Sequence, residues 1–412
     1  MAITTTEAVA ASPWAGSARP ATPQEWIRRA EEVATILEVD AVERDRVQAT
    51  PHDEVRLLKQ AGLVTLLGPA AHGGGGQDWR TAYQVIRRVA EGDGSIGQLL
   101  GYHYLWSQLP AFFGTPAQAE AIIGEATREG WFFGGAVNPR DADLRAADLG
   151  AELSFSGRKT FSTGSKVSDV TWLEAALDGH EDHVFALAPS DHPGITFHDD
   201  WDALGQRLTE SGSVTITDVV LPWTAALGWV DKEFRPTVYN TVCLVSIQLV
   251  FTNFYLGIAE GGLRTASAYT RERTRPWPYT DDPQERGVDE AYLLDGYGDL
   301  RAKLWAAQAL ADRAAEALQE LHDAPDAVTP RRRGEVAVLV AAAKQRAVDV
   351  GLEVGTRAYE LTGARATASQ VGLDRFWRNV RTHSLHDPIA FKRREVGVFV
   401  LRDEVPEPTW YS

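Results

Sequence analysis

The spacing of apolar residues changes twice along the chain. In the first third, apolar residues recur every three or four positions, as on the buried face of a helix. Short runs rich in β-branched and aromatic residues then take over, and the helical spacing returns in the last part. The pattern predicts an α+β protein with an N-terminal all-α domain (1–129), a middle β domain (130–234) and a C-terminal helical bundle with a tail (235–412).

Capping signals mark the helices of the first part. Thr22-Pro23-Gln24-Glu25 has the form of a capping box with proline at the first helical position, and it predicts a helix that runs to about Val47. A second helix is predicted to open at Thr50 and to close at Gly62. Residues 1–21 lack a basic segment followed by an apolar run, so they are predicted to be a disordered tail and not a secretory signal.

Turn residues such as Ser156-Gly157 separate the short runs of the middle part. Five of these runs are predicted to be strands: Trp131–Val137, Ala151–Phe155, Val170–Leu177, Val184–Ala188 and Ser213–Leu221.

Four helices are predicted after residue 235, at about 237–273, 288–323, 329–362 and 373–401. Because the connections between them are short, a four-helix bundle is expected. Pro388 should end or kink the last of these helices.

Composition narrows the classes of partner. Lys plus Arg number 41 and Asp plus Glu number 57, and the resulting net charge of −16 argues against binding to nucleic acid or anionic lipid. Cys243 is the only cysteine, so the chain has no internal disulfide, and a reducing cytoplasm is expected. No strand–GxGxxG–helix unit and no GxxxxGK[ST] loop occurs, and no uninterrupted apolar run is long enough to predict a membrane span.

The densest group of proton-transferring side chains is RTHSLHDP. On a helix, His383, His386 and Asp387 would share one face. A metal site would need a further ligand, and the sequence has no zinc-binding motif, so no metal is predicted. Two structural histidines at a helix end and two acid/base histidines in a pocket both remain open, because histidine exchanges protons near neutral pH.

Other candidates are weaker alone. Arg275, in YTRERTRPW, and Arg365 follow helices and could hold a phosphate, although solvated helix ends are an equal alternative. The stretch KTFSTGSKVSD (159–169) is rich in small hydroxylic residues, which usually form turns. Trp201 is either part of the core or the wall of a pocket. His103 lies among aromatic residues, where a structural histidine is the default.

Taken together and in order, these motifs resemble the acyl-CoA dehydrogenase superfamily, and within it the flavin-dependent monooxygenase branch typified by the dibenzothiophene monooxygenases. The resemblance runs from about residue 41 to 397. Its strongest pieces are GDGSIGQLLGYH, DDWDALGQRLTESGS, NFYLGIAEGGL, YTRERTRPW and DRFWRNVRTHSLHDP. It implies the fold of that superfamily, in which the middle domain is a β-barrel.

The resemblance also implies a cofactor and roles for particular residues. The cofactor would be FMN, bound as FMNH2, with FAD as an alternative. Catalytic roles are implied for His103, Thr163, His383 and His386. Contacts to the flavin are implied for Thr163, Trp201 and Ser211, and contacts to its phosphate for Arg275 and Arg365, of which Arg365 would come from a neighbouring subunit.

The implied reaction is oxygenation of a small aromatic or heteroatom substrate through a C4a-hydroperoxyflavin, with sulfoxidation of a dibenzothiophene-like thiophene as the leading prediction. N-hydroxylation or aromatic C-hydroxylation within the same branch, and an acyl-CoA dehydrogenase, are the alternatives. The dehydrogenase is disfavoured because SLHDP has no glutamate where dehydrogenases of the superfamily often carry their base. Gly135 stands where close relatives have asparagine, which leaves the substrate open.

Partners follow from the same resemblance. Because the chain has no nicotinamide-binding motif, a separate NAD(P)H:flavin reductase is predicted to supply reduced flavin. A homotetramer is also expected.

Overall fold

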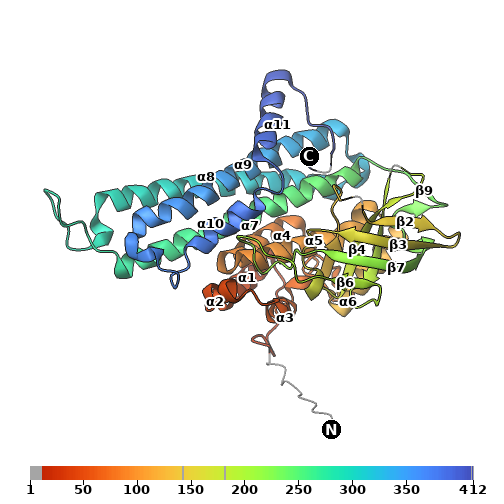
Figure 1. Cartoon of the computed structure of the whole chain (residues 1–412). Helices are drawn as coiled ribbons and strands as arrows, with labels where there is room; N and C mark the ends of the chain where they lie inside the picture. Colours follow the sequence, from red (N-terminus) through yellow and green to blue (C-terminus); the bar gives the residue numbers. More distant parts are fainter. Residues whose placement is uncertain (1–11, 142, 181, 410, 412) are drawn as a thin grey trace, which may run out of the picture.

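The computed structural model describes residues 12–141, 143–180, 182–409 and 411. Figure 1 shows three parts in chain order: a group of helices, a β-sheet beside it, and a bundle of long helices that extends away from both. The predicted disorder of residues 1–11 lies outside the described residues. Within residues 12–21, Trp14 Nε1 donates a hydrogen bond of 2.6 Å to Glu32.

The described residues of the N-terminal part form six α-helices, and the capping box predicted at Thr22 is present, whereas Thr50 does not cap α3. Thr22 and Thr115 each cap a helix with a capping box and a proline in the first turn. The helices are α1 (Pro23–Glu38), α2 (Ala41–Val47), α3 (His52–Gln60), α4 (Trp79–Gly92), α5 (Gly94–Phe113) and α6 (Pro116–Glu129). The single helix predicted to run to Val47 is wrong in one respect: it breaks at Val39 and Asp40, and Arg44 donates back to the Leu37 carbonyl.

The middle part is a curled seven-stranded sheet. Its strands are β1 (Phe133–Ala136), β2 (Arg145–Asp148), β3 (Glu152–Lys159), β4 (Val170–Leu177), β5 (His183–Pro189), β6 (Ile195–Phe197) and β7 (Val214–Pro222). The order is β1-β4-β2-β3-β7-β6, with β5 on the other side of β4. A separate hairpin joins β8 (Trp229–Val230) to β9 (Glu233–Phe234).

All five predicted strands are present in the seven-stranded sheet. Its other two strands, β2 and β6, were missed, as was the β8–β9 hairpin. Both are short, and β2 has one buried residue in four, so neither carries the apolar alternation by which strands are recognised in a sequence. Hydrogen bonding to β3 and β7 makes them strands.

The C-terminal part is built on three long helices, and the remaining helices pack against them. These are α7 (Val242–Arg273), α8 (Ala291–Asp323), α9 (Pro330–Thr362), α10 (Asp374–His383) and α11 (Ile389–Arg402). The fourth predicted helix is two helices, because the chain turns at residues 384–388 ahead of Pro388. The segment Tyr239–Arg273 is apolar and long enough to cross a membrane, but 89% of its most apolar window is buried within the described chain. It is the central helix of the core, and α4, α5, α8 and α9 surround it.

Candidate active site

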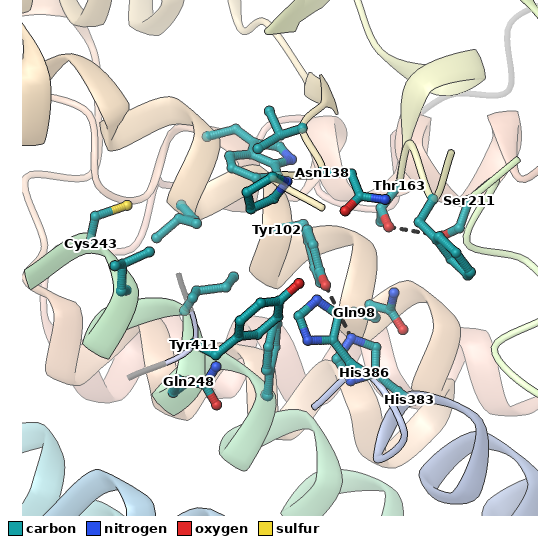
Figure 2. A pocket seen from close by; sticks show the side chains of 18 of the residues that line it. Gln98, Tyr102, Asn138, Thr163, Ser211, Cys243, Gln248, His383, His386 and Tyr411 are labelled. Atoms are coloured by element: carbon teal, nitrogen blue, oxygen red, sulfur yellow. Dashed lines mark hydrogen bonds between the residues drawn. The ribbon is translucent and has the colours of Figure 1, made fainter. Parts of the chain in front are cut away.

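A cavity of about 500 Å³ lies where the three parts of the chain meet. Helix α5 and the start of α7 supply one side, the loops of the β-sheet supply a second, and the α10–α11 turn closes the third (Figure 2). No Asp or Glu is among its described lining residues. Of the predicted site residues, the cavity brings together Thr163, Trp201, Ser211, His383 and His386.

His383 and His386 lie against each other at the cavity wall. Their rings stack with centroids 5.4 Å apart and planes 6° from parallel, and the edge of Phe251 packs against both rings. His383 is the last residue of α10, whereas His386 follows in the turn, so the two histidines do not share a helical face as predicted. The turn brings them together instead. His386 is 39% exposed, and its ring borders the cavity.

His383 is held between two tyrosines. Its Nε2 lies 3.1 Å from the hydroxyl of Tyr102, and its Nδ1 lies 2.7 Å from the hydroxyl of Tyr255. Burial, reinforced by His386 and Lys344, lowers the pKa of His383 well below its usual value, and burial raises the pKa of both tyrosines. His383 is therefore neutral, and one of its nitrogens donates while the other accepts. Within the described residues no cluster of three or more metal-ligating side chains occurs.

Across the cavity, two loops of the sheet present buried hydroxyl groups. Thr163 Oγ1 lies 2.9 Å from Ser211 Oγ, which in turn lies 2.8 Å from Thr209 Oγ1. Main-chain bonds from Ser162 to Gly212 and from Gly164 to Thr209 join the two loops. These bonds fix the hydroxyls in place, so the Ser/Thr/Gly stretch singled out in the sequence is more than a solvated turn.

Next to these hydroxyls the cavity has an aromatic wall and polar atoms without partners. Trp201 donates through Nε1 to the Gln206 carbonyl and meets the ring of Phe161 edge-on. Within the described chain, both side-chain amide atoms of Gln206, Oε1 of Gln98 and Oγ1 of Thr382 are buried without a hydrogen bond. Buried polar atoms are rarely left unpaired. The cavity is therefore suited to a flat ligand that carries both donors and acceptors, as the edge of a flavin ring does.

His103 is placed elsewhere. Its Nε2 lies 2.7 Å from the Val64 carbonyl, its Nδ1 accepts from the Phe133 N–H at 3.1 Å, and its ring stacks on Phe132. It is 1% exposed and is not part of the cavity lining. Burial lowers its pKa to about 4. With both nitrogens bound to the main chain, His103 has no nitrogen free for a ligand, so the structure supports a role in holding α5 against β1.

Replacing His103 by alanine is expected to lower the free energy of unfolding by about 2–4 kcal/mol, because it strands the Val64 carbonyl and the Phe133 N–H and leaves a void. The folded-state pKa lies below the value of 6.5 for the free side chain. As the pH falls, His103 is therefore protonated in the unfolded chain before it is protonated in the folded protein. This favours the unfolded chain, so the protein loses stability between about pH 6.5 and about pH 4. Urea unfolding across that range measures both effects, and the variant should show a shallower pH dependence.

Arg275 and Arg365 meet in a second pocket at the far end of α7. Arg273, Thr274 and Gln370 also line it. The last residue of α7 in the cavity lining is Phe251, and the first in this pocket is Tyr269. Eighteen residues of helix separate them, about 27 Å at 1.5 Å per residue. Within one chain the two arginines therefore lie far from Thr163 and Ser211.

Position 135 has to be glycine because the indole of Trp106 leaves no room for a side chain there. A Cβ at this position would lie 2.8 Å from Cε2 of Trp106, whose indole lines the cavity. Strand β1 cannot move away, since it pairs with β4 and Trp172 of β4 donates to the Trp106 carbonyl at 2.9 Å. Asn138 lines the cavity nearby and donates to Thr160.

Several residues that line the cavity or lie behind it were missed by sequence reasoning. Tyr102 was overlooked in favour of its neighbour His103. Adjacent residues on a helix point about 100° apart, so only one of the two can face the cavity, and it is Tyr102. Lys344 carried a usable signal, as a lysine within the apolar run AVLVAAAKQRAVDV. Tyr411, at the end of the chain, had none; its ring centroid lies 5.7 Å from that of His386.

Comparison with known proteins agrees with this architecture. Residues 25–129 match the family model for the acyl-CoA dehydrogenase N-terminal domain, and residues 249–390 match a model for the C-terminal domain. The protein is therefore a member of the acyl-CoA dehydrogenase superfamily.

Relatives of known name narrow this further. Dibenzothiophene monooxygenase of Mycolicibacterium goodii is 36% identical, over 94% of this chain and 96% of its own. The probable FMNH2-dependent monooxygenase SfnC of Pseudomonas putida is 34% identical over 95% of this chain and 98% of its own. Among solved structures, methanesulfinate monooxygenase MsuC of Pseudomonas fluorescens superposes with a TM-score of 0.89, at 36% identity over 94% of this chain and 99% of that one. FMN-bound TdsC of Paenibacillus sp. A11-2 superposes with a TM-score of 0.87. The two sequences are 36% identical, over 94% of this chain and 100% of that one. The chain belongs to the flavin-dependent monooxygenase branch of the superfamily.

Proposed function

We propose that this protein is the oxygenase of a two-component system, which uses FMNH2 and O2 to oxygenate a small, largely apolar sulfur compound. The observation that carries the proposal is the histidine pair, His383 and His386, which faces the Thr163–Ser211 hydroxyls across a cavity whose described lining has no carboxylate. A dehydrogenase would need a carboxylate base there to remove a proton from carbon. No such base is among the lining residues that the structure describes, which argues against that alternative.

The cavity fits a flavin ring at its β-sheet end. The hydroxyls of Thr163 and Ser211 and the unpaired amide of Gln206 are hydrogen-bonding partners for the ring's polar edge. Trp201 gives that end an aromatic wall. Reduced FMN supplies the electrons that activate O2.

The residues of this chain then supply positioning and protons. His386 presents its ring at the cavity surface, where Nε2 can take up a proton and pass it to the reacting oxygen. His383 does not exchange a proton with solvent at neutral pH, because Tyr102 and Tyr255 occupy both of its nitrogens. It holds the ring of His386 by stacking and orients the Tyr102 hydroxyl that lines the cavity.

The other end of the cavity is apolar and suits the body of the substrate. Its walls are Leu105, Trp106, Leu109, Phe113, Phe185 and Ile247. Such walls exclude water, which protects reactive oxygen species from side reactions. The names of the relatives, a dibenzothiophene monooxygenase and a methanesulfinate monooxygenase, point to an organic sulfur compound.

The FMN phosphate is proposed to be held by a second copy of the chain. Arg275 and Arg365 form a basic pocket suited to a phosphate, but they lie about 27 Å along α7 from the cavity. A flavin ring beside Thr163 in one copy could reach these arginines only on another copy. The site is therefore complete only in an oligomer, which we take to be a homotetramer.

Helix α8 offers a face for that assembly. Leu294 and Trp305 are 61% and 62% exposed, and at eleven residues apart they lie on the same side of the helix. Aromatic residues such as Trp305 are enriched in the contact surfaces between proteins. Trp305→Glu is expected to dissociate the tetramer into smaller species without unfolding the chain. Sedimentation velocity measures the change, and a tetramer that persists would show that this face is not the interface.

Reduced flavin must come from a separate reductase in the same compartment, proposed to be the cytoplasm. The test is a product screen with enzymatically supplied FMNH2 against dibenzothiophene, alkyl sulfones and sulfinates, indole and amines. Oxygenation of a sulfur compound supports the proposal, and oxygenation of an amine or a ring carbon instead would move the protein to the N-hydroxylase or C-hydroxylase alternative. Rapid oxidation of NADH by the purified chain with FMN would contradict the need for a reductase.

A further inference from the structure

A buried lysine lies behind the histidine pair. Lys344, on α9, is fully buried, and its Nζ donates to Gln248 Oε1 at 2.5 Å and to Oδ1 of Asp387. The ammonium also lies 5.0 Å from the centroid of Phe251, the ring that packs against both histidines. Two helices, α7 and α9, and the α10–α11 turn meet at this one charge.

Asp387 connects this lysine to His386. The Oδ1 atom that accepts from Lys344 also lies 3.4 Å from Nδ1 of His386. Asp387 is 6% exposed, and its Oδ2 has no hydrogen-bond partner in the described chain. The turn at residues 384–388 produces this arrangement, because it places Asp387 under the ring of the residue before it.

Stability alone does not account for such a pair. Removing two charges from water costs about as much as their attraction returns, and apolar residues of similar volume often serve a core as well or better. The charges of this pair are strongly perturbed. Burial lowers the pKa of Lys344 to about 8, and Lys344 keeps the pKa of Asp387 low although burial acts in the opposite direction. Because Asp387 of this buried pair contacts His386 at the cavity, a role in positioning that histidine explains the pair better than stability does.

We propose that Asp387 and Lys344 are positioning residues for His386. Asp387 accepts from Nδ1–H and thereby directs Nε2 toward the cavity, and Lys344 keeps Asp387 ionised so that it can accept. This inference rests on the proposed function, because it gives the proton-handling atom of that site its orientation. It uses the same physical logic by which a carboxylate fixes the tautomer of a catalytic histidine in hydrolases.

The surroundings of the pair set its dependence on pH. Other titratable groups near it are Tyr102 of α5, Tyr255 of α7, His383 of α10, Tyr411, and Lys392 and Glu395 of α11, which pair with each other at 2.9 Å. Burial keeps His383 and the tyrosines neutral through the neutral range, so Lys344 is the group that changes charge as the pH rises through about 8. Asp387 then loses the ammonium that holds its Oδ1 beside Nδ1 of His386, so the orientation of His386 should be lost on the alkaline side.

Nuclear magnetic resonance of flavin-free protein labelled with 15N-histidine tests the orientation directly. The His386 signal is identified by its absence from a His386→Gln sample. We expect the Nδ1–H tautomer near pH 7, with a change in the signal centred near pH 8. Asp387→Asn and Lys344→Met should each shift the tautomer balance toward Nε2–H. A wild-type His386 already in the Nε2–H form would overturn the inference.

Product formed per FMNH2 oxidised provides the second readout. Lys344→Met is expected to lower this ratio about tenfold or more at pH 7. Arginine keeps its charge at all accessible pH values. In Lys344→Arg, the fall in product per FMNH2 at alkaline pH should therefore begin at least ~1 pH unit higher than in the wild type. A role confined to stability predicts no such rescue at high pH.

A double variant guards against misfolding. Lys344→Met combined with Asp387→Leu removes both charges together, so the variant should fold with a melting temperature near that of the wild type. It should still form little product per FMNH2 oxidised. If this variant forms as much product per FMNH2 oxidised as the wild type does, the pair is structural only. If the wild-type protein has the predicted His386 tautomer but oxygenates nothing with FMNH2, the proposed function fails and the positioning role stands.

Discussion

Replacing His386 by alanine is expected to lower the rate of product formation by about 10²–10⁴-fold, while the enzyme continues to consume FMNH2 and O2 and releases hydrogen peroxide. The ring of His386 is the partly exposed imidazole of the pair, and it borders the cavity. The folded protein should tolerate its removal, because the ring is 39% exposed and its one hydrogen-bonding partner, Asp387, stays paired with Lys344. The uncoupled reaction follows because the oxygen species then has no positioned imidazole to pass it a proton.

Oxygen consumption, peroxide release and product are measured in parallel to check this result. His52→Ala is a matched control, since His52 is an exposed histidine at the start of α3. It should leave all three rates unchanged. If His386→Ala instead keeps the product-to-peroxide ratio of the wild type, the histidine pair is a structural feature of the turn.

Arg275→Ala and Arg365→Ala are each expected to weaken FMN binding by about 10–150-fold. The range corresponds to the loss of one charged hydrogen bond, about 1.5–3 kcal/mol. The effect should be confined to the phosphate, because both arginines lie in the second pocket and not beside the ring site. Titration with FMN and with riboflavin, which has no phosphate, separates the two contributions. Equal weakening of both ligands would contradict phosphate binding.

Mixed oligomers test whether the phosphate site belongs to a second copy. Arg365→Ala chains retain an intact cavity, and His386→Ala chains retain an intact Arg365. When the two are co-expressed, some cavities with His386 meet an intact Arg365 on a neighbouring chain, and activity should exceed the sum of the two pure variants. Absence of this complementation would place the arginine and the flavin ring in the same chain, against the length of α7 between them.

Much of the fold could be predicted because the signals are local. The capping box at Thr22 uses residues three apart, and it occurs where expected. Strand β4 has its predicted bounds, since its apolar run is long and flanked by turn residues. The short strand β2 could not be predicted, because pairing with β3 defines it.

By itself, the sequence determined the order of helical and β parts, the family likeness, and the histidine segment with no glutamate beside it. These features are readable because they depend on neighbouring residues or on rare residues in fixed order. Tertiary structure alone decided which groups meet. It turned Tyr102 into the cavity and His103 into the core, it placed Lys344 behind Asp387, and it set the arginines about 27 Å along α7 from the cavity. Such contacts join residues tens to hundreds of positions apart, and packing of helices and loops brings them together, which no local pattern records.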